Sequence, residues 1–247
     1  MSKEPQAIRG DYQFWVMQHG PRVQRFWHRN KIQVMERALP VSAAEVLVDI
    51  GCGSGNLIFR GGAGARLALG LDVSEAALRF CNSRKDGTPC VFVCARGDAF
   101  PLPEACADAA LLVEVIEHLS SPREVLGEIW RILRDGGRLF ITTPNYAFPS
   151  LWPAWEWLAD RSGLVPRMAG EQHVQKFGPD SLQALVRQTG FAADRLGTFY
   201  HWSPFASLIS ESWADGLVAR EVEGGARSGA LVYCVARKVR GRPAAVA

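Results

Sequence analysis

The segment VLVDIGCGSGN, residues 46–56, decides the fold. Residues 46–50 have the length and apolar character of a buried strand. Gly51, Gly53 and Gly55 follow at once, and glycine permits both a tight turn and the close approach of a ligand to the backbone. A buried strand that runs directly into such a loop predicts an α/β fold that binds a ligand at one end of its sheet.

Strand-like and helix-like segments alternate along the rest of the chain. Short, almost wholly apolar strands separated by helices predict a parallel sheet covered on both faces. Strands are expected at 46–50, 67–72, 91–95, 109–113, 138–143 and 231–236, and helices at 21–39, 74–83, 122–134 and 179–189.

The domain organisation follows from this alternation of strands and helices and from the stretches that interrupt it. Residues 1–40 are expected to form an N-terminal helical cap, and residues 41–247 a single larger domain. Aromatic-rich stretches with few strand signals, at about 146–177 and 200–229, interrupt that domain. We interpret them as insertions over the end of the sheet at which open α/β folds bind ligands.

Composition excludes several classes of protein. The net charge of +3 among 247 residues is far from the basic balance of a dedicated nucleic-acid binder, which disfavours a long nucleic-acid partner. Six cysteines without a CxxC pair fit a reducing compartment and no zinc site. The N-terminus lacks the layout of a signal peptide, and no uncharged apolar run could span a bilayer. The sequence predicts a cytoplasmic protein.

Acidic residues accompany the glycine loop. A dinucleotide loop of the form G-x-G-x-x-G needs a third glycine, and Asn56 stands at that position. The acidic Asp49 also disfavours a dinucleotide. Its carboxylate is suited instead to a ligand that carries an ammonium group. Asp72 ends the next strand and could accept both hydroxyls of a ribose, while Ser74 supplies the helix N-cap. Asp98, after the third strand, is either an ordinary loop aspartate or a partner of an adenine amino group, with Ala99 and Phe100 beside the ring.

Five motifs carry a resemblance to the class I S-adenosylmethionine (SAM) dependent methyltransferases. They are VDIGCGSG, GLDVS, GDAFPLP, ALLVEVIEHL and RILRDGGRLFITTPN, in the family's order and spacing. The resemblance covers residues 45–145 well and 171–191 moderately. It implies a Rossmann-like α/β fold with a mostly parallel seven-stranded sheet, and SAM as cofactor.

The resemblance also assigns cofactor residues. In the family the glycine loop holds the methionine part, the acid after the second strand holds the ribose, and the acid after the third meets the adenine. The residues assigned to SAM are Asp49, Gly51, Cys52, Gly53, Gly55, Asp72, Val73, Asp98, Ala99 and Glu114. The segment RGGAG, 60–64, departs from the family, which usually continues a helix there. Since each interior glycine costs a helix about 1 kcal/mol relative to alanine, we expect a short or frayed helix.

The segment EVIEHL, 114–119, follows the fourth strand and carries a second group of polar residues. If a helical turn begins here, Glu114 and Glu117 share a face, and His118 lies one turn from Glu114. With His173, these side chains would suit a divalent metal such as Mg. The alternative without a metal uses His118 or His173 as a general base, with Glu117 orienting it. The candidate catalytic residues are therefore Glu117, His118 and His173, and the candidate metal ligands are these three with Glu114.

The same pattern resembles two branches of the family. One methylates polyprenylated catechols in the ubiquinone pathway, and the other methylates the terminal ribose 2′-hydroxyl of small RNAs. Both have E-x-x-E-H and a later histidine before a K/R-F pair, here Lys176-Phe177. The resemblance implies O-methylation of a small-molecule acceptor: a catechol, a natural product or a lipid-linked molecule. Terminal ribose methylation of RNA and a non-catalytic SAM-binding subunit remain alternatives, and the oligomeric state is left open.

Overall fold

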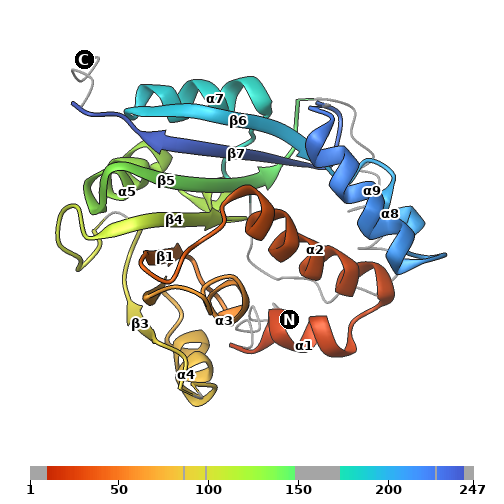
Figure 1. Ribbon diagram of the computed structural model, residues 1–247, viewed down its shortest axis with the longest axis horizontal. Coiled ribbons are helices and arrows are strands. Elements are labelled where there is room, and N and C mark those ends of the chain that lie inside the picture. The colour runs from red at the N-terminus through yellow and green to blue at the C-terminus, as the bar shows by residue number, and fades with distance from the viewer. Residues whose placement is uncertain (1–9, 86, 98, 148–172, 226, 242–247) are drawn as a thin grey trace, which may run out of the picture.

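The computed structural model describes residues 10–85, 87–97, 99–147, 173–225 and 227–241 (Figure 1). Its strands are β1 (Val46–Ile50), β2 (Leu67–Asp72), β3 (Cys90–Cys94), β4 (Ala107–Val113), β5 (Leu133–Pro144), β6 (Phe191–Phe199) and β7 (Leu231–Lys238). Its helices are α1 (Tyr12–His19), α2 (Arg22–Ala38), α3 (Asn56–Arg60), α4 (Glu75–Ser83), the 3-10 turn η1 (Ile116–His118), α5 (Pro122–Ile132), α7 (Pro179–Gln188), α8 (Ser203–Ala206) and α9 (Glu211–Glu223).

The strands form one seven-stranded sheet in the order β3-β2-β1-β4-β5-β7-β6. The strands β1 to β5 pair in parallel, while β7 runs antiparallel to both β5 and β6. The mostly parallel seven-stranded sheet is therefore confirmed. The order of the strands reverses between β1 and β4, which is the point where open α/β sheets bind their ligands.

Helices cover both faces of this sheet, and alternate residues of each strand face opposite layers. In β4, Ala110 and Leu112 pack in the core that includes α5 and α7. Ala109 and Leu111 pack in the core that includes α2 and α9. The helices α2, α8 and α9 lie side by side on that second face (Figure 1). The burial of both faces explains why these strands are apolar throughout.

The helix α2 is joined to α9 by polar contacts as well as by its apolar face. Arg29 forms ion pairs with Glu211 at 2.5 Å and with Asp215 at 3.0 Å. The buried Asn30 also donates to Asp215, at 3.1 Å. These contacts hold α2 in place beside the carboxyl ends of the parallel strands.

Several details differ from the sequence-based expectations. The strand β6, residues 191–199, was not among the expected strands, and β5 begins at Leu133, where a helix was expected to end. The expected short helix after the glycine loop is confirmed, because α3 has only five residues.

The stretch 200–229 contains α8 and α9, whereas residues 148–172 of the other expected insertion lie outside the described residues. Within the described part of the chain, no helix combines the length and the hydropathy that a membrane span requires.

Candidate functional site

The glycine loop links β1 to α3 at the carboxyl edge of the sheet. Gly51, Gly53 and Gly55 have φ angles of +73°, +49° and +71°, a region that side-chain-bearing residues rarely adopt. A Cβ atom on Gly51 would lie 2.4 Å from a methyl group of Val115. The backbone N–H of Gly51 donates to the carbonyl of Leu71 at 2.8 Å, which holds the loop against β2. The sequence therefore needs glycine here for both conformation and space.

Asp72 connects the end of β2 to this loop. Its Oδ2 atom accepts the N–H of Gly53 at 2.8 Å, and its Oδ1 atom accepts the N–H of Ser74 at 2.8 Å. Ser74 caps α4 by accepting the N–H of Ala77, which confirms its expected capping role. A carboxylate oxygen can accept more than one hydrogen bond, so Asp72 retains capacity for ligand hydroxyls. Val73 beside it is exposed.

Asp49 is the buried acid of the site. Its side chain is 1% exposed, and neither carboxylate oxygen has a hydrogen-bond partner among the described residues. Burial raises the pKa of Asp49 well above its usual range, and the nearby carboxylate of Asp72 raises it further. An unpartnered buried carboxyl group normally has a functional explanation. The ammonium of a SAM methionine group is a cation of the kind that would satisfy it.

The helix α1 covers the glycine loop. The N–H of Phe14 donates to the hydroxyl of Ser54 at 3.2 Å. The Gln13 side chain lies close above Gly53, because a Cβ atom there would be 3.0 Å from its Oε1 atom. The Arg84 guanidinium lies 4.0 Å from the centre of the Phe14 ring. The helix α1 thus covers the glycine loop, which the glycine motif alone did not indicate.

The remaining residues expected to contact the cofactor differ in how exposed their side chains are. Asp98 lies outside the described residues, and Ala99 is exposed. Phe100 is buried in the core that includes α5, and its position beside a ligand ring stays a prediction. The Cys52 thiol is buried, and its contact with Cys81, together with burial, raises its pKa. Cys52 therefore contributes its backbone to the loop, and its side chain packs behind it.

Glu114 does not lie on a helix. It has a φ angle of +55°, and its N–H continues the ladder with β5 by donating to the Thr142 carbonyl at 3.0 Å. Its carboxylate pairs with Lys31 of α2 at 3.2 Å and accepts a hydrogen bond from the Thr142 hydroxyl at 3.4 Å. The expectation that Glu114 and Glu117 share a helical face is wrong, because η1 begins only at Ile116.

Glu117, His118 and His173 come together beside this acid. One possible ligand atom from each lies within 4.8 Å of the others, and Glu114 is not part of this group. The rings of His118 and His173 have centres 4.9 Å apart. Glu117 is 1% exposed and accepts a hydrogen bond from Thr143 at 3.0 Å. Burial raises the pKa of Glu117 to about 8, and the carboxylate of Glu114 contributes to that rise.

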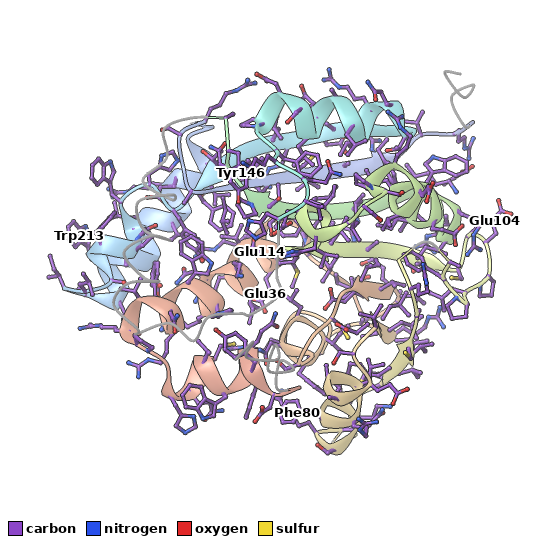
Figure 2. All side chains as sticks on the ribbon, turned by 180° about the vertical axis from the view of Figure 1, so that it is seen from behind. Glu36, Phe80, Glu104, Glu114, Tyr146 and Trp213 are labelled. Atoms are coloured by element: carbon purple, nitrogen blue, oxygen red, sulfur yellow. The ribbon has the colours of Figure 1, made fainter. Side chains whose placement is uncertain are left out.

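Backbone pairing brings His173 to the other two residues. The N–H of Gln175 donates to the carbonyl of Glu117 at 2.9 Å, and the N–H of Tyr146 donates to the carbonyl of Phe177 at 2.7 Å. The segment that contains His173 is thereby fixed between η1 and the end of β5. Figure 2 shows Glu114 and Tyr146 near the middle of the molecule.

Sequence reasoning did not single out Lys31 or Tyr146, which both contact expected site residues. Lys31 reaches Glu114 from α2, and the Tyr146 hydroxyl is hydrogen-bonded to His173. Tyr146 directly follows RILRDGGRLFITTPN, one of the motifs that carry the resemblance. Nothing in the local sequence of α2 distinguishes Lys31 from an ordinary surface lysine.

Comparisons with known proteins agree with this geometry. Residues 48–141 match the family model described as "Methyltransferase domain". The chain is 27% identical over 184 residues to the mitochondrial ubiquinone biosynthesis O-methyltransferase of Mus musculus, covering 68% of this chain and 49% of that protein. It is 32% identical over 124 residues to a probable SAM-dependent methyltransferase of Mycobacterium tuberculosis, covering 50% of this chain and 44% of that protein. The chain thus spans about half the length of these curated relatives.

The solved structures support the fold. A SAM-dependent methyltransferase from Thermotoga maritima superposes with a TM-score of 0.66 at 20% identity, over 92% of this chain and 95% of that chain. A likeness at this level of identity shows a shared fold. Residues 48–141, which the family model matches, lie within that fold. Residues 48–141 are therefore a methyltransferase domain, carried on the fold of the class I SAM-dependent methyltransferases.

Proposed function

We propose that this protein transfers the methyl group of SAM to a hydroxyl oxygen of a small-molecule acceptor, either a catechol, a natural product or a lipid-linked molecule. The observation that carries the proposal is the placement of two groups at one edge of the sheet. The glycine loop follows β1 and Asp72 ends β2, while Glu117 and His118 follow β4 and His173 lies beside them. A cofactor on the first group would lie beside the second.

The cofactor site fits SAM on three counts. The loop glycines adopt positive φ angles, which form the tight turn after β1 that a methionine group could contact. Asp72 offers carboxylate oxygens to the ribose hydroxyls. The unpartnered carboxyl group of Asp49 is suited to the ammonium of the methionine part, since buried charges are normally paired.

The reaction is a direct displacement in which positioning supplies much of the acceleration. The acceptor oxygen forms a bond to the methyl carbon while the bond from sulfur to that carbon breaks, and the sulfur keeps the electron pair. The acceptor proton goes to a ring nitrogen of His118 or His173, because imidazole is a suitable base near neutral pH. The carboxyl group of Glu117 lies beside the imidazole of His118, with 4.0 Å between its Oε1 atom and Nε2 of that ring.

A divalent ion such as Mg²⁺ is compatible with the same residues. Glu117, His118 and His173 would hold it, because carboxylate and imidazole are both common ligands. Its chemistry would be to lower the pKa of a coordinated hydroxyl. Glu114 is not assigned as a ligand in this proposal, since Lys31 and Thr142 engage its carboxylate.

Methyl-labelled SAM tests the proposal with a panel of catechols, sugars and short RNAs. We expect label on a hydroxyl oxygen of a small-molecule acceptor, and much less transfer by His118→Gln. Label found on nitrogen or carbon, or on the RNA ends alone, would contradict the proposed acceptor class. Exhaustive EDTA treatment distinguishes the two mechanisms, because only an enzyme with a bound ion loses activity and regains it with Mg²⁺ or Mn²⁺.

A further inference from the structure

Tyr146 is the residue that most directly constrains His173. Its hydroxyl is hydrogen-bonded to the Nδ1 atom of His173, and the two rings meet edge to face with centres 6.0 Å apart. Its own backbone is fixed by the hydrogen bond to Phe177. The ammonium of Lys176 lies 5.7 Å from the centre of the phenol ring. The phenol is thus held from several sides and can hold the imidazole in turn.

The direction of this hydrogen bond decides what His173 can do. A neutral imidazole carries one proton, so one ring nitrogen donates and the other keeps a lone pair. If the Tyr146 hydroxyl donates to Nδ1, the proton of His173 is on Nε2, and that nitrogen can neither accept a proton nor bind an ion. If Nδ1 donates to the phenol oxygen, Nε2 keeps its lone pair. Only the second arrangement makes Nε2 of His173 available as a base or as a ligand.

We propose that Tyr146 is a positioning residue whose phenol oxygen accepts the Nδ1–H of His173 and thereby leaves the lone pair on Nε2. The inference rests on the proposed function, in which His173 acts as a base or as a ligand. Partners on the far nitrogen of functional histidines commonly fix the tautomer and the ring orientation in this way. Here the partner is a phenol, where a carboxylate or a backbone carbonyl is the more usual choice.

The same part of the chain also positions Glu117. The hydroxyl of Thr143 donates to Oε2 of Glu117 at 3.0 Å, so the end of β5 also orients the second member of the group. Thr143 and Tyr146 are three residues apart in one segment, and each contacts a different member of the group. One stretch of chain therefore sets the orientation of both side chains.

Nitrogen chemical shifts of histidine labelled with nitrogen-15 test the proposal in the intact protein, without acceptor. They distinguish the two tautomers when recorded at a pH where the imidazole is neutral. The signal of His173 is identified by its loss in His173→Gln. We expect the wild-type protein to hold His173 with its proton on Nδ1. In Tyr146→Phe, which keeps the ring and its contact with Lys176, we expect a shift toward the Nε2–H form that free imidazole side chains favour.

Two further measurements distinguish a positioning role of the Tyr146 hydroxyl from a merely structural one. SAM affinity should be unchanged in Tyr146→Phe, because the variant removes the hydrogen bond to His173, which the proposed function places on the acceptor side. Tyr233→Phe removes another buried hydroxyl, which donates to Val222 at 2.8 Å, and should leave the His173 signal as it is in the wild type. A wild-type His173 with its proton on Nε2 would overturn the proposal, as would equal tautomer shifts in the two phenylalanine variants. None of these readouts requires methyl transfer, so they can fail while the proposed function holds.

Discussion

The backbone N–H of Gly53 donates to Oδ2 of Asp72 at 2.8 Å, which ties the glycine loop to the end of β2. Asp72→Ala removes this acceptor together with the one for Ser74. In the proposed function it also removes the acceptor for the ribose hydroxyls, and leaving such donors unpaired costs about 1–3 kcal/mol, so SAM affinity should fall roughly 5- to 150-fold. Titration calorimetry with SAM measures the change.

Glu75→Ala is the matched control for that variant. Glu75 lies in the first turn of α4 and pairs with Arg79 at 3.0 Å, but both side chains are exposed. Such exposed pairs contribute little to stability. Its SAM affinity should therefore equal that of the wild type. An Asp72→Ala protein that folds and binds SAM as tightly as Glu75→Ala would remove Asp72 from the cofactor site.

Two glycine substitutions should have opposite effects. Gly51→Ala places a Cβ atom 2.4 Å from Val115 at a residue with positive φ, so we expect lower thermal stability and a loss of SAM binding. Gly216→Ala lies within α9, where a Cβ atom would meet nothing within 4 Å. It should raise the free energy of unfolding by about 1 kcal/mol, because alanine favours the helix. Thermal denaturation of both proteins checks the contrast, and equal effects would refute it.

The cover formed by α1 should control how fast the cofactor leaves. The Phe14 ring lies 5.4 Å from Phe80 and beneath the Arg84 guanidinium. Phe14→Ala loses these contacts, so we expect the SAM dissociation rate to rise severalfold. Trp15, the next residue of α1, is exposed and stacks on His19. Stopped-flow measurements should find Trp15→Ala close to the wild type, and similar rates for Phe14→Ala and wild type would count against a covering role.

His28 on α2 should make stability depend on pH. Burial, together with the positive charge of Lys31, lowers the pKa of His28 to about 3. The unfolded chain binds a proton at this histidine below about pH 6.5, whereas the folded protein does not until near pH 3. Acidification across this window therefore favours the unfolded state, and stability falls as the pH falls. Urea denaturation between about pH 7 and pH 5 should show a shallower decline for His28→Gln than for the wild type, and parallel declines would contradict the assignment.

The sequence predicted the parallel core of the sheet well and its edge poorly. The bounds of β1 and β2 agree with the expectation, because wholly apolar runs bounded by loop signals are distinctive. The strand β6 was missed because residues 191–199 include exposed polar positions and lack regular alternation. Its strand conformation comes from pairing with β7, a contact between distant parts of the chain. Tertiary pairing of this kind leaves a weak local pattern.

The candidate site divides in the same way. The glycine loop and Asp72 were predictable because each follows directly from a buried strand. The spacing of Glu114 and Glu117 indicated a helix, but the N–H of Glu114 pairs with Thr142 instead, and that pairing sets its backbone. Lys31 was not predictable from local sequence, because only the packing of α2 brings it to the site.

A calorimetric titration of the unmodified protein with SAM tests the central claim most directly. The account predicts saturable binding of one SAM molecule per chain, competed by S-adenosylhomocysteine, which shares the methionine and adenosine parts held by the glycine loop and Asp72. A folded wild-type protein that gives no binding heat, and also shows no thermal stabilisation by either compound, would contradict the cofactor site on which every other inference depends.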